Sequence, residues 1–153
     1  MITQEELGVI KATVEEFLAK MTVIGFTLQA TSPASDAVDL RIDLAEPQFL
    51  IGQDGKTLLD LQRLLKIVLH KKLGKVFYVK LDINEYNTKK TEHVKKMASQ
   101  AADQVSLTGI SKTLPPMSSY ERRIVHAELA GRSDVTTESQ GEGESRSVVI
   151  MPR

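Results

Sequence analysis

The sequence predicts an α+β protein with two small domains, residues 1–86 and 107–153, joined by a Lys-rich helix at 87–106. Three observations predict this class. Segments with helical spacing of apolar residues are mixed with short segments in which apolar and polar residues alternate. Glycines and prolines separate these segments. With 153 residues and 41% hydrophobic content, the chain can bury one or two compact cores.

The first domain is expected to begin with one helix and two strands. Thr3 and Glu6 have the spacing of a capping box, and apolar residues then recur at helical spacing over residues 4–20. Residues 26–31 and 37–44 alternate apolar and polar side chains on either side of a Ser-Pro-Ala-Ser-Asp segment. This alternation predicts two paired strands.

A short helical turn and a long helix are expected next. The short turn should deliver Phe49 and Ile51 to the core. The long helix, residues 56–73, should end at Gly74, because glycine commonly ends helices. Its expected buried stripe is Leu58, Leu61, Leu65 and Val68, with Leu64 and Leu69 beside them. Residues 76–83 predict a third strand.

The second half predicts two further helices and a pair of strands. A Lys-rich helix from about residue 87 should carry apolar residues on one face and lysines on the other. Those lysines are Lys89, Lys90, Lys95 and Lys96. Pro115-Pro116 enforces an extended segment before a helix capped by Ser118 or Ser119. The tail from residue 134 predicts two short strands around a Gly-rich turn.

The net charge of zero is an average over a polarised chain. Residues 1–55 carry 3 basic and 9 acidic side chains, a net charge of −6, whereas residues 56–110 carry 11 and 5, a net charge of +6. The remaining 43 residues carry 6 of each. Such asymmetry is typical of proteins that bind nucleic acids or acidic surfaces, and Lys-rich solvated helix faces would give the same counts.

The segment Gly52-Gln53-Asp54-Gly55, followed by Lys56, is the first candidate site. Glycines lack a Cβ, so the backbone can come close to a phosphodiester. The helix that begins after them offers unpaired N–H groups and the positive end of its dipole. Taken alone, two glycines three apart also suit a loop that only needs permissive residues.

Arg122, Arg123 and His126 form the second candidate site. An arginine and a histidine four residues apart lie one above the other on a helix face. The planar guanidinium can bind phosphate or stack under a base, and the imidazole can donate or stack. Taken alone, such a pair more often has a structural role, with the histidine held in a local hydrogen-bond network.

The first domain resembles a type II K-homology (KH) domain, with elements in the order α-β-β-α-α-β around Ile-Gly-x-x-Gly. In that family the glycine loop clamps single-stranded nucleic acid. The resemblance implies that Gly52 and Gly55 bring the backbone to phosphate while Lys56 supplies charge. The loop departs from the family pattern, because its variable positions are Gln53 and Asp54 rather than a basic residue. Either the loop binds weakly, or Asp54 points away and pairs locally.

The segment from Arg122 to His126, with its Pro-Pro-Met-Ser-Ser-Tyr-Glu lead and Gly-Glu-Gly-Glu tail, resembles a small domain named for an Arg and a His separated by three residues. That Arg-x-x-x-His family binds single-stranded nucleic acid. A KH domain followed by such a domain is similar to the bacterial Jag (SpoIIIJ-associated) family over nearly the whole chain. Jag proteins commonly carry a further N-terminal domain, which we expect this sequence to lack.

The resemblance implies a protein that binds single-stranded RNA, or single-stranded DNA, and regulates transcripts linked to cell envelope growth and division. It also implies pairing with a small stand-alone KH protein or with a second copy. The alternative is a protein-interaction adaptor, in which the KH fold is a dimerisation scaffold and RNA binding is weak or lost.

We expect no enzymatic activity, cofactor or metal. Cysteine is absent, and the three histidines lack metal-ligand spacing. The Arg and His pair is accompanied by neither metal-binding carboxylates nor a nucleophile. No signal peptide or membrane segment is recognisable, so the expected location is the cytoplasm.

Overall fold

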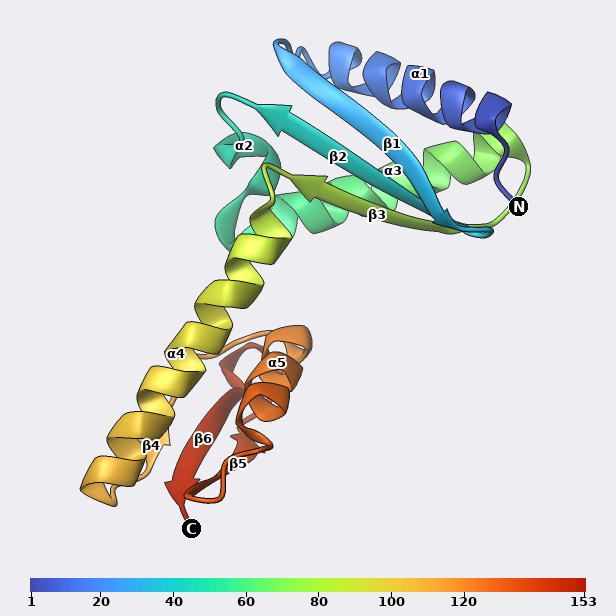
Figure 1. Cartoon of the computed structure of the whole chain (residues 1–153). Coiled ribbons are helices and arrows are strands. Elements are labelled where there is room, and N and C mark those ends of the chain that lie inside the picture. Colours follow the sequence, from blue (N-terminus) through green and yellow to red (C-terminus); the bar gives the residue numbers. More distant parts are fainter. The chain divides into compact units, whose positions relative to one another are not determined.

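The computed structural model describes all 153 residues, which form two compact units, Met1–Asn87 and Thr88–Arg153 (Figure 1). Each unit has its own three-stranded sheet and its own hydrophobic core. The mixed α+β class expected from the sequence is therefore confirmed.

Unit 1 contains four helical segments and three strands. Their bounds are α1 Gln4–Lys20, β1 Phe26–Ala34, β2 Ala37–Leu44, α2 Gln48–Ile51, the 3-10 turn η1 Gln53–Gly55, α3 Lys56–Leu73 and β3 Tyr78–Ile83. The strand order is β1-β2-β3, with β1 antiparallel and β3 parallel to β2. None of the helices in either unit combines the length and the apolar character needed to cross a bilayer.

The core of unit 1 lies between the sheet and two helices. Alternation along β2 turns Val38, Leu40 and Ile42 to the buried face and charged residues to the other. Helices α1 and α3 lie against the buried face (Figure 1). The opposite face is polar, so the sheet has the pattern of a layer covered on one side only.

Local signals set the helix ends where the sequence predicted them. The Thr3 N–H donates to Oε2 of Glu6 at 2.8 Å, and the Glu6 N–H donates to Oγ1 of Thr3 at 3.2 Å, which confirms the capping box. Gly74 ends α3 in the left-handed conformation, with φ 66°, and its N–H donates to the carbonyl of His70 at 2.9 Å.

Three details of unit 1 differ from the prediction. At α2, Leu50 fills the core and is 1% exposed, whereas Phe49 is 56% exposed. A single turn of about 3.6 residues has too little periodicity to show which side chain points inward. In α3, Leu69 is buried as expected, whereas Val68 is only partly buried and Leu64 is 52% exposed. Strand β3 starts two residues late because pairing with β2 begins only at Tyr78.

The outer edge of β3 is partly closed by side chains. In a parallel pair, alternate N–H groups point away from the neighbouring strand. Among these, the Leu81 N–H donates to Oε1 of Gln62 on α3 at 2.8 Å, and the Ile83 N–H donates to Oδ1 of Asp82 at 3.0 Å. Two outward amides of the edge strand are thus already paired.

Unit 2 is built from two helices and a small antiparallel sheet. The bounds are α4 Tyr86–Thr108, whose first two residues belong to unit 1, β4 Lys112–Thr113, α5 Ser119–Leu129, β5 Val135–Gln140, the 3-10 turn η2 Gly143–Ser145 and β6 Ser147–Pro152. The strand order is β4-β6-β5. Strand β4 was not predicted, because two residues carry no alternation.

Helix α4 forms one side of the hydrophobic core of unit 2. Its buried residues are Val94, Ala98, Ala101, Ala102 and Val105. They pack with Val125 and Leu129 of α5 and with Val148 and Ile150 of β6. The helix that the sequence assigned to a connection therefore supplies the apolar surface on which the rest of unit 2 is built.

Candidate nucleic-acid interface

The glycine loop lies at the surface of unit 1, where α2 passes into α3. Gln53, Asp54 and Lys56 are exposed, and both glycines are partly exposed. Gly55 is the N-cap of α3 and has no side chain with which to cap the helix. The N–H of Lys56 donates to the carbonyl of Gln53. The positive dipole end of this 18-residue helix lies at the loop.

The chain's own packing requires both glycines. A Cβ at Gly52 would clash with the side chain of Thr57, and a Cβ at Gly55 would lie 2.7 Å from Cε1 of Tyr86. Their φ angles, 70° and 78°, are also in the range that favours glycine. The sequence predicts that the two glycines leave room for a close phosphate. In the structure, the side chains of Thr57 and Tyr86 occupy the space where the two Cβ atoms would lie.

On α5, His126 is held by two hydroxyl groups from β5. Nδ1 of His126 lies 2.7 Å from Oγ1 of Thr137, and Nε2 lies 2.9 Å from Oγ of Ser139. A hydroxyl can donate or accept, so the ring is held whichever nitrogen carries the proton. The hydrogen-bond network that the structural alternative required is therefore present. It also fixes the plane of the ring.

Arg122 lies one turn before His126 and is anchored at one end. Its Nη1 donates to the carbonyl of Met117 at 2.9 Å, and the side chain is half-buried. A guanidinium has five N–H donors in a rigid fork, so one hydrogen bond leaves most of them for a ligand. The neighbouring Arg123 and Tyr120 are exposed.

The four lysines of α4 do not share one face. Nζ of Lys90 lies 3.2 Å from Oε1 of Glu121, and Nζ of Lys95 lies 3.9 Å from Oε2 of Glu128, both on α5. Lys89 and Lys96 are exposed and, seven residues apart, lie on the same side of the helix. Lys90 and Lys95 are thus paired with carboxylates of the same unit, and a role of the four lysines as a supporting basic face stays a prediction.

Glu121 ties the start of α5 to α4. Burial would raise the pKa of its carboxyl, but hydrogen bonds from Ser118 and Lys90 outweigh burial and hold this pKa below its ordinary value. Ser118 and Glu121 form a reciprocal capping box, as the Ser-x-x-Glu spacing allows. The ionised carboxylate therefore fixes the helix that carries Arg122.

Sequence reasoning missed the side chains that hold the candidate site. Tyr86 supports the glycine loop, and Thr137 and Ser139 orient His126. The only available signal was the two-residue spacing of the hydroxyls, which puts both on one face of a strand. No group of three or more histidines and acids is arranged to hold a metal ion.

A family model for the R-3-H domain, the Arg-x-x-x-His family, matches residues 92–152. The match begins inside α4, two residues before Val94, the first buried residue of the second core. The matched segment contains Arg122, His126 and the two hydroxyls that hold the imidazole ring.

Three similar proteins carry the name "RNA-binding protein KhpB". That of Lactiplantibacillus plantarum is 35% identical over 114 residues, which are 74% of this chain and 35% of that protein. That of Clostridium symbiosum is 34% identical over 140 residues, 83% of this chain and 63% of that protein. That of Bacillus subtilis is 40% identical over 103 residues, 66% of this chain and 50% of that protein. The chain thus spans 35% to 63% of the length of these curated relatives.

Proposed function

From the premise that this chain contains an Arg-x-x-x-His domain and is homologous to the KhpB RNA-binding proteins, we propose that it binds single-stranded RNA. The observation that carries the proposal is the pair Arg122 and His126, anchored side by side on α5 within the matched segment. Anchored side chains lose little conformational freedom on binding, so the pair is preorganised for a ligand.

In unit 2, Arg122 binds a phosphate or stacks under a base through the free part of its fork. His126 contributes the face of its ring, because both ring nitrogens are already engaged. Of the two roles considered for His126 from the sequence, donating a hydrogen bond and stacking, we therefore assign stacking. Arg123 and Lys96 are exposed cations of the same unit and add long-range attraction for the strand.

In unit 1, we assign the KH role to the loop of residues 52–56. Backbone amides at the start of α3 bind a phosphate, and Lys56 adds charge. Asp54 opposes the phosphate, since two like charges about 6 Å apart repel by a few kcal/mol at an effective dielectric near ~20. This loop is therefore the weaker of two sites, and tethering raises the affinity of the whole chain.

The resemblance to the Jag family also supports a proposal for the role of this chain in the cell. We infer a non-enzymatic regulator of transcripts in the cytoplasm, linked to envelope growth and division, that pairs with a small stand-alone KH protein or with a second copy. The alternative is a protein-interaction adaptor whose RNA binding is weak or lost. Direct measurements of RNA binding distinguish the regulator from the adaptor.

Fluorescence anisotropy with a labelled 12-nucleotide oligouridine tests unit 2. We expect Arg122→Ala to weaken binding roughly tenfold and to lower the salt slope by about one phosphate equivalent. Arg153→Ala, an exposed arginine of the same unit, is the control and should change affinity far less. If Arg122→Ala lowers only the melting temperature, the residue is structural, and if the unaltered chain does not bind RNA at all, the adaptor is favoured.

The same assay tests the loop with Asp54→Asn. Asparagine tolerates the positive φ of this position, 54°, and removes the charge, so binding should tighten about threefold or more. Asp60→Asn, an exposed acid further along α3, is the control. Equal affinity for Asp54→Asn and the unaltered chain would remove the loop from the RNA path.

A further inference from the structure

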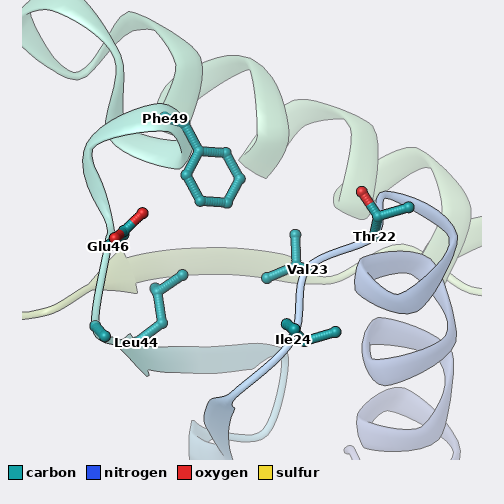
Figure 2. A pocket seen from close by; sticks show the side chains of 7 residues that line it. Thr22, Val23, Ile24, Leu44, Glu46 and Phe49 are labelled. Atoms are coloured by element: carbon teal, nitrogen blue, oxygen red, sulfur yellow. The ribbon is translucent and has the colours of Figure 1, made fainter.

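Unit 1 has a cavity of about 270 Å³ that takes no part in the proposed RNA contacts. Residues 22–24, between α1 and β1, form one wall, and residues 44–46 with Phe49 of α2 form the other. Figure 2 shows the Phe49 ring pointing from α2 into the cavity, with Val23 and Leu44 across from it. Its volume is below the 300–1,000 Å³ that is typical of small-molecule sites, and suits one or two side chains of a peptide.

The cavity has a buried apolar floor and an exposed apolar rim. Val23 and Leu44 are buried, whereas Ile24 is 86% exposed and Phe49 is 56% exposed. Scattered apolar side chains on a surface are ordinary, but here two large ones flank a concavity that is itself apolar. The sequence predicts that Phe49 is buried in the core. Its exposed position at the rim of the cavity is therefore set by the fold and not by the local sequence pattern.

Charge around the cavity favours a cationic occupant. Glu46 is the only charged residue that lines it, and this exposed carboxylate pairs with no lysine or arginine. The whole lining comes from residues 1–55, which carry 9 acidic and 3 basic side chains. A polyanion is therefore disfavoured here. A guanidinium could stack on the face of Phe49 and pair with Glu46 at once.

A strained backbone conformation at Thr22, which lines the cavity, is a second and independent observation. Thr22, in the lining, has φ 60°, and its hydroxyl donates to the carbonyl of Met21 at 2.6 Å. The left-handed conformation is uncommon for a β-branched residue, and the position after a helix usually holds glycine or asparagine. Strained backbone persists where the surroundings enforce it, and such positions concentrate at functional sites.

We propose that this cavity docks a segment of a partner protein in which an arginine stands next to an apolar residue. The guanidinium lies over the Phe49 ring and against the Glu46 carboxylate. The apolar neighbour packs between Val23, Leu44 and Ile24. The site is separate from the RNA-binding residues, so either proposal can fail without the other.

The test is an NMR titration of the full ¹⁵N-labelled chain with the blocked peptide Gly-Ser-Leu-Arg-Ile-Ser-Gly. We expect saturable shifts of the backbone amides at 22–24, 44–46 and 49. A peptide with glutamine in place of its arginine should bind about threefold or more weakly, because it lacks the charge for both contacts. Absence of saturable shifts at these amides, or equal binding of the two peptides, overturns the proposal.

Variants of the chain make the test specific. Glu46→Gln and Phe49→Ala should each lower peptide affinity about threefold or more, and both positions are exposed, so the fold should be retained. Glu15→Gln removes an exposed acid of α1 outside the cavity and should leave affinity unchanged. Three outcomes overturn the proposal. The first is unaltered peptide binding by both cavity variants. The second is a shift of the same amides when the protein concentration alone is raised, which would assign the cavity to a second copy, and the third is a shift of these amides on addition of oligouridine, which would assign it to nucleic acid.

Discussion

At Thr22, the chain tolerates a conformation that its side chain disfavours, with φ 60° just after α1. Replacing this residue by asparagine keeps a polar side chain and lowers the cost of the left-handed conformation. We expect Thr22→Asn to stabilise unit 1 by about 1 kcal/mol and to raise its melting temperature by roughly 4 °C or more. Thermal unfolding followed by circular dichroism checks this. An unchanged or lower melting temperature would mean that the Thr22 hydroxyl compensates for the strain.

A second residue-scale prediction concerns Gly55 and the ring of Tyr86. Gly55→Ala introduces both a left-handed alanine and a clash with that ring, so unit 1 should lose about 2–3 kcal/mol. The control is Gly74→Ala, which has φ 66° but no atom within 4 Å of the added Cβ, and should lose only about 1–2 kcal/mol. Urea unfolding measures both. In a Tyr86→Ala background the excess cost at Gly55 should disappear; an equal cost of the two alanines would contradict the clash.

At the scale of elements, Arg132 joins α4 to the start of β5. It contacts Asp134 through two hydrogen bonds, at 3.0 and 2.6 Å, and Asp103 of α4 at 2.5 Å. Hydrogen bonds from Arg132, and then from Ser106, hold the pKa of Asp134 well below its ordinary value. A carboxyl whose pKa is lowered by folding stabilises the fold above its unfolded pKa of about 3.9, and this contribution is lost as the pH falls.

Asp134→Asn should therefore lower the melting temperature of unit 2 near neutral pH, and this difference should shrink between about pH 5 and pH 2. The ion pair is partly solvent-exposed, so the effect should also weaken with added salt. Melting curves of both proteins across this pH range are the measurement. Glu138→Gln, on the same strand and without an ion pair, is the control. A difference that stays constant down to pH 2 would assign the effect of Asp134 to something other than its charge.

Elements defined by local chemistry were predictable, and those defined by tertiary contacts were not. Thr3 with Glu6, Gly74 and Ser118 each act within one turn of their own helix, so the sequence alone shows them. The choice of Leu50 over Phe49 for the core depends on how α2 meets the sheet. In the candidate site, the Arg122–His126 spacing is visible in the sequence, but the hydroxyls that hold the ring come from a strand 11 to 13 residues later.

At the scale of the whole molecule, the two cores predict where the chain can be divided. Residues 88–153 retain every buried residue of the second core, whereas residues 107–153 lose all five that α4 contributes. A small domain buries little surface to begin with, so this loss should abolish folding. We expect dispersed amide spectra and cooperative unfolding for 88–153 only. A folded 107–153 fragment would show that α4 is dispensable and would restore the boundary expected from the sequence.

The side-chain acceptors at the outer edge of β3 affect how easily this strand can pair with another molecule. An uncovered edge strand is a template for intermolecular strand addition, which is a common route to aggregation. Gln62 and Asp82 already accept two of the outward amides of β3. A strand arriving from another molecule would first have to displace these acceptors. These two acceptors therefore disfavour the addition of a foreign strand at the β3 edge.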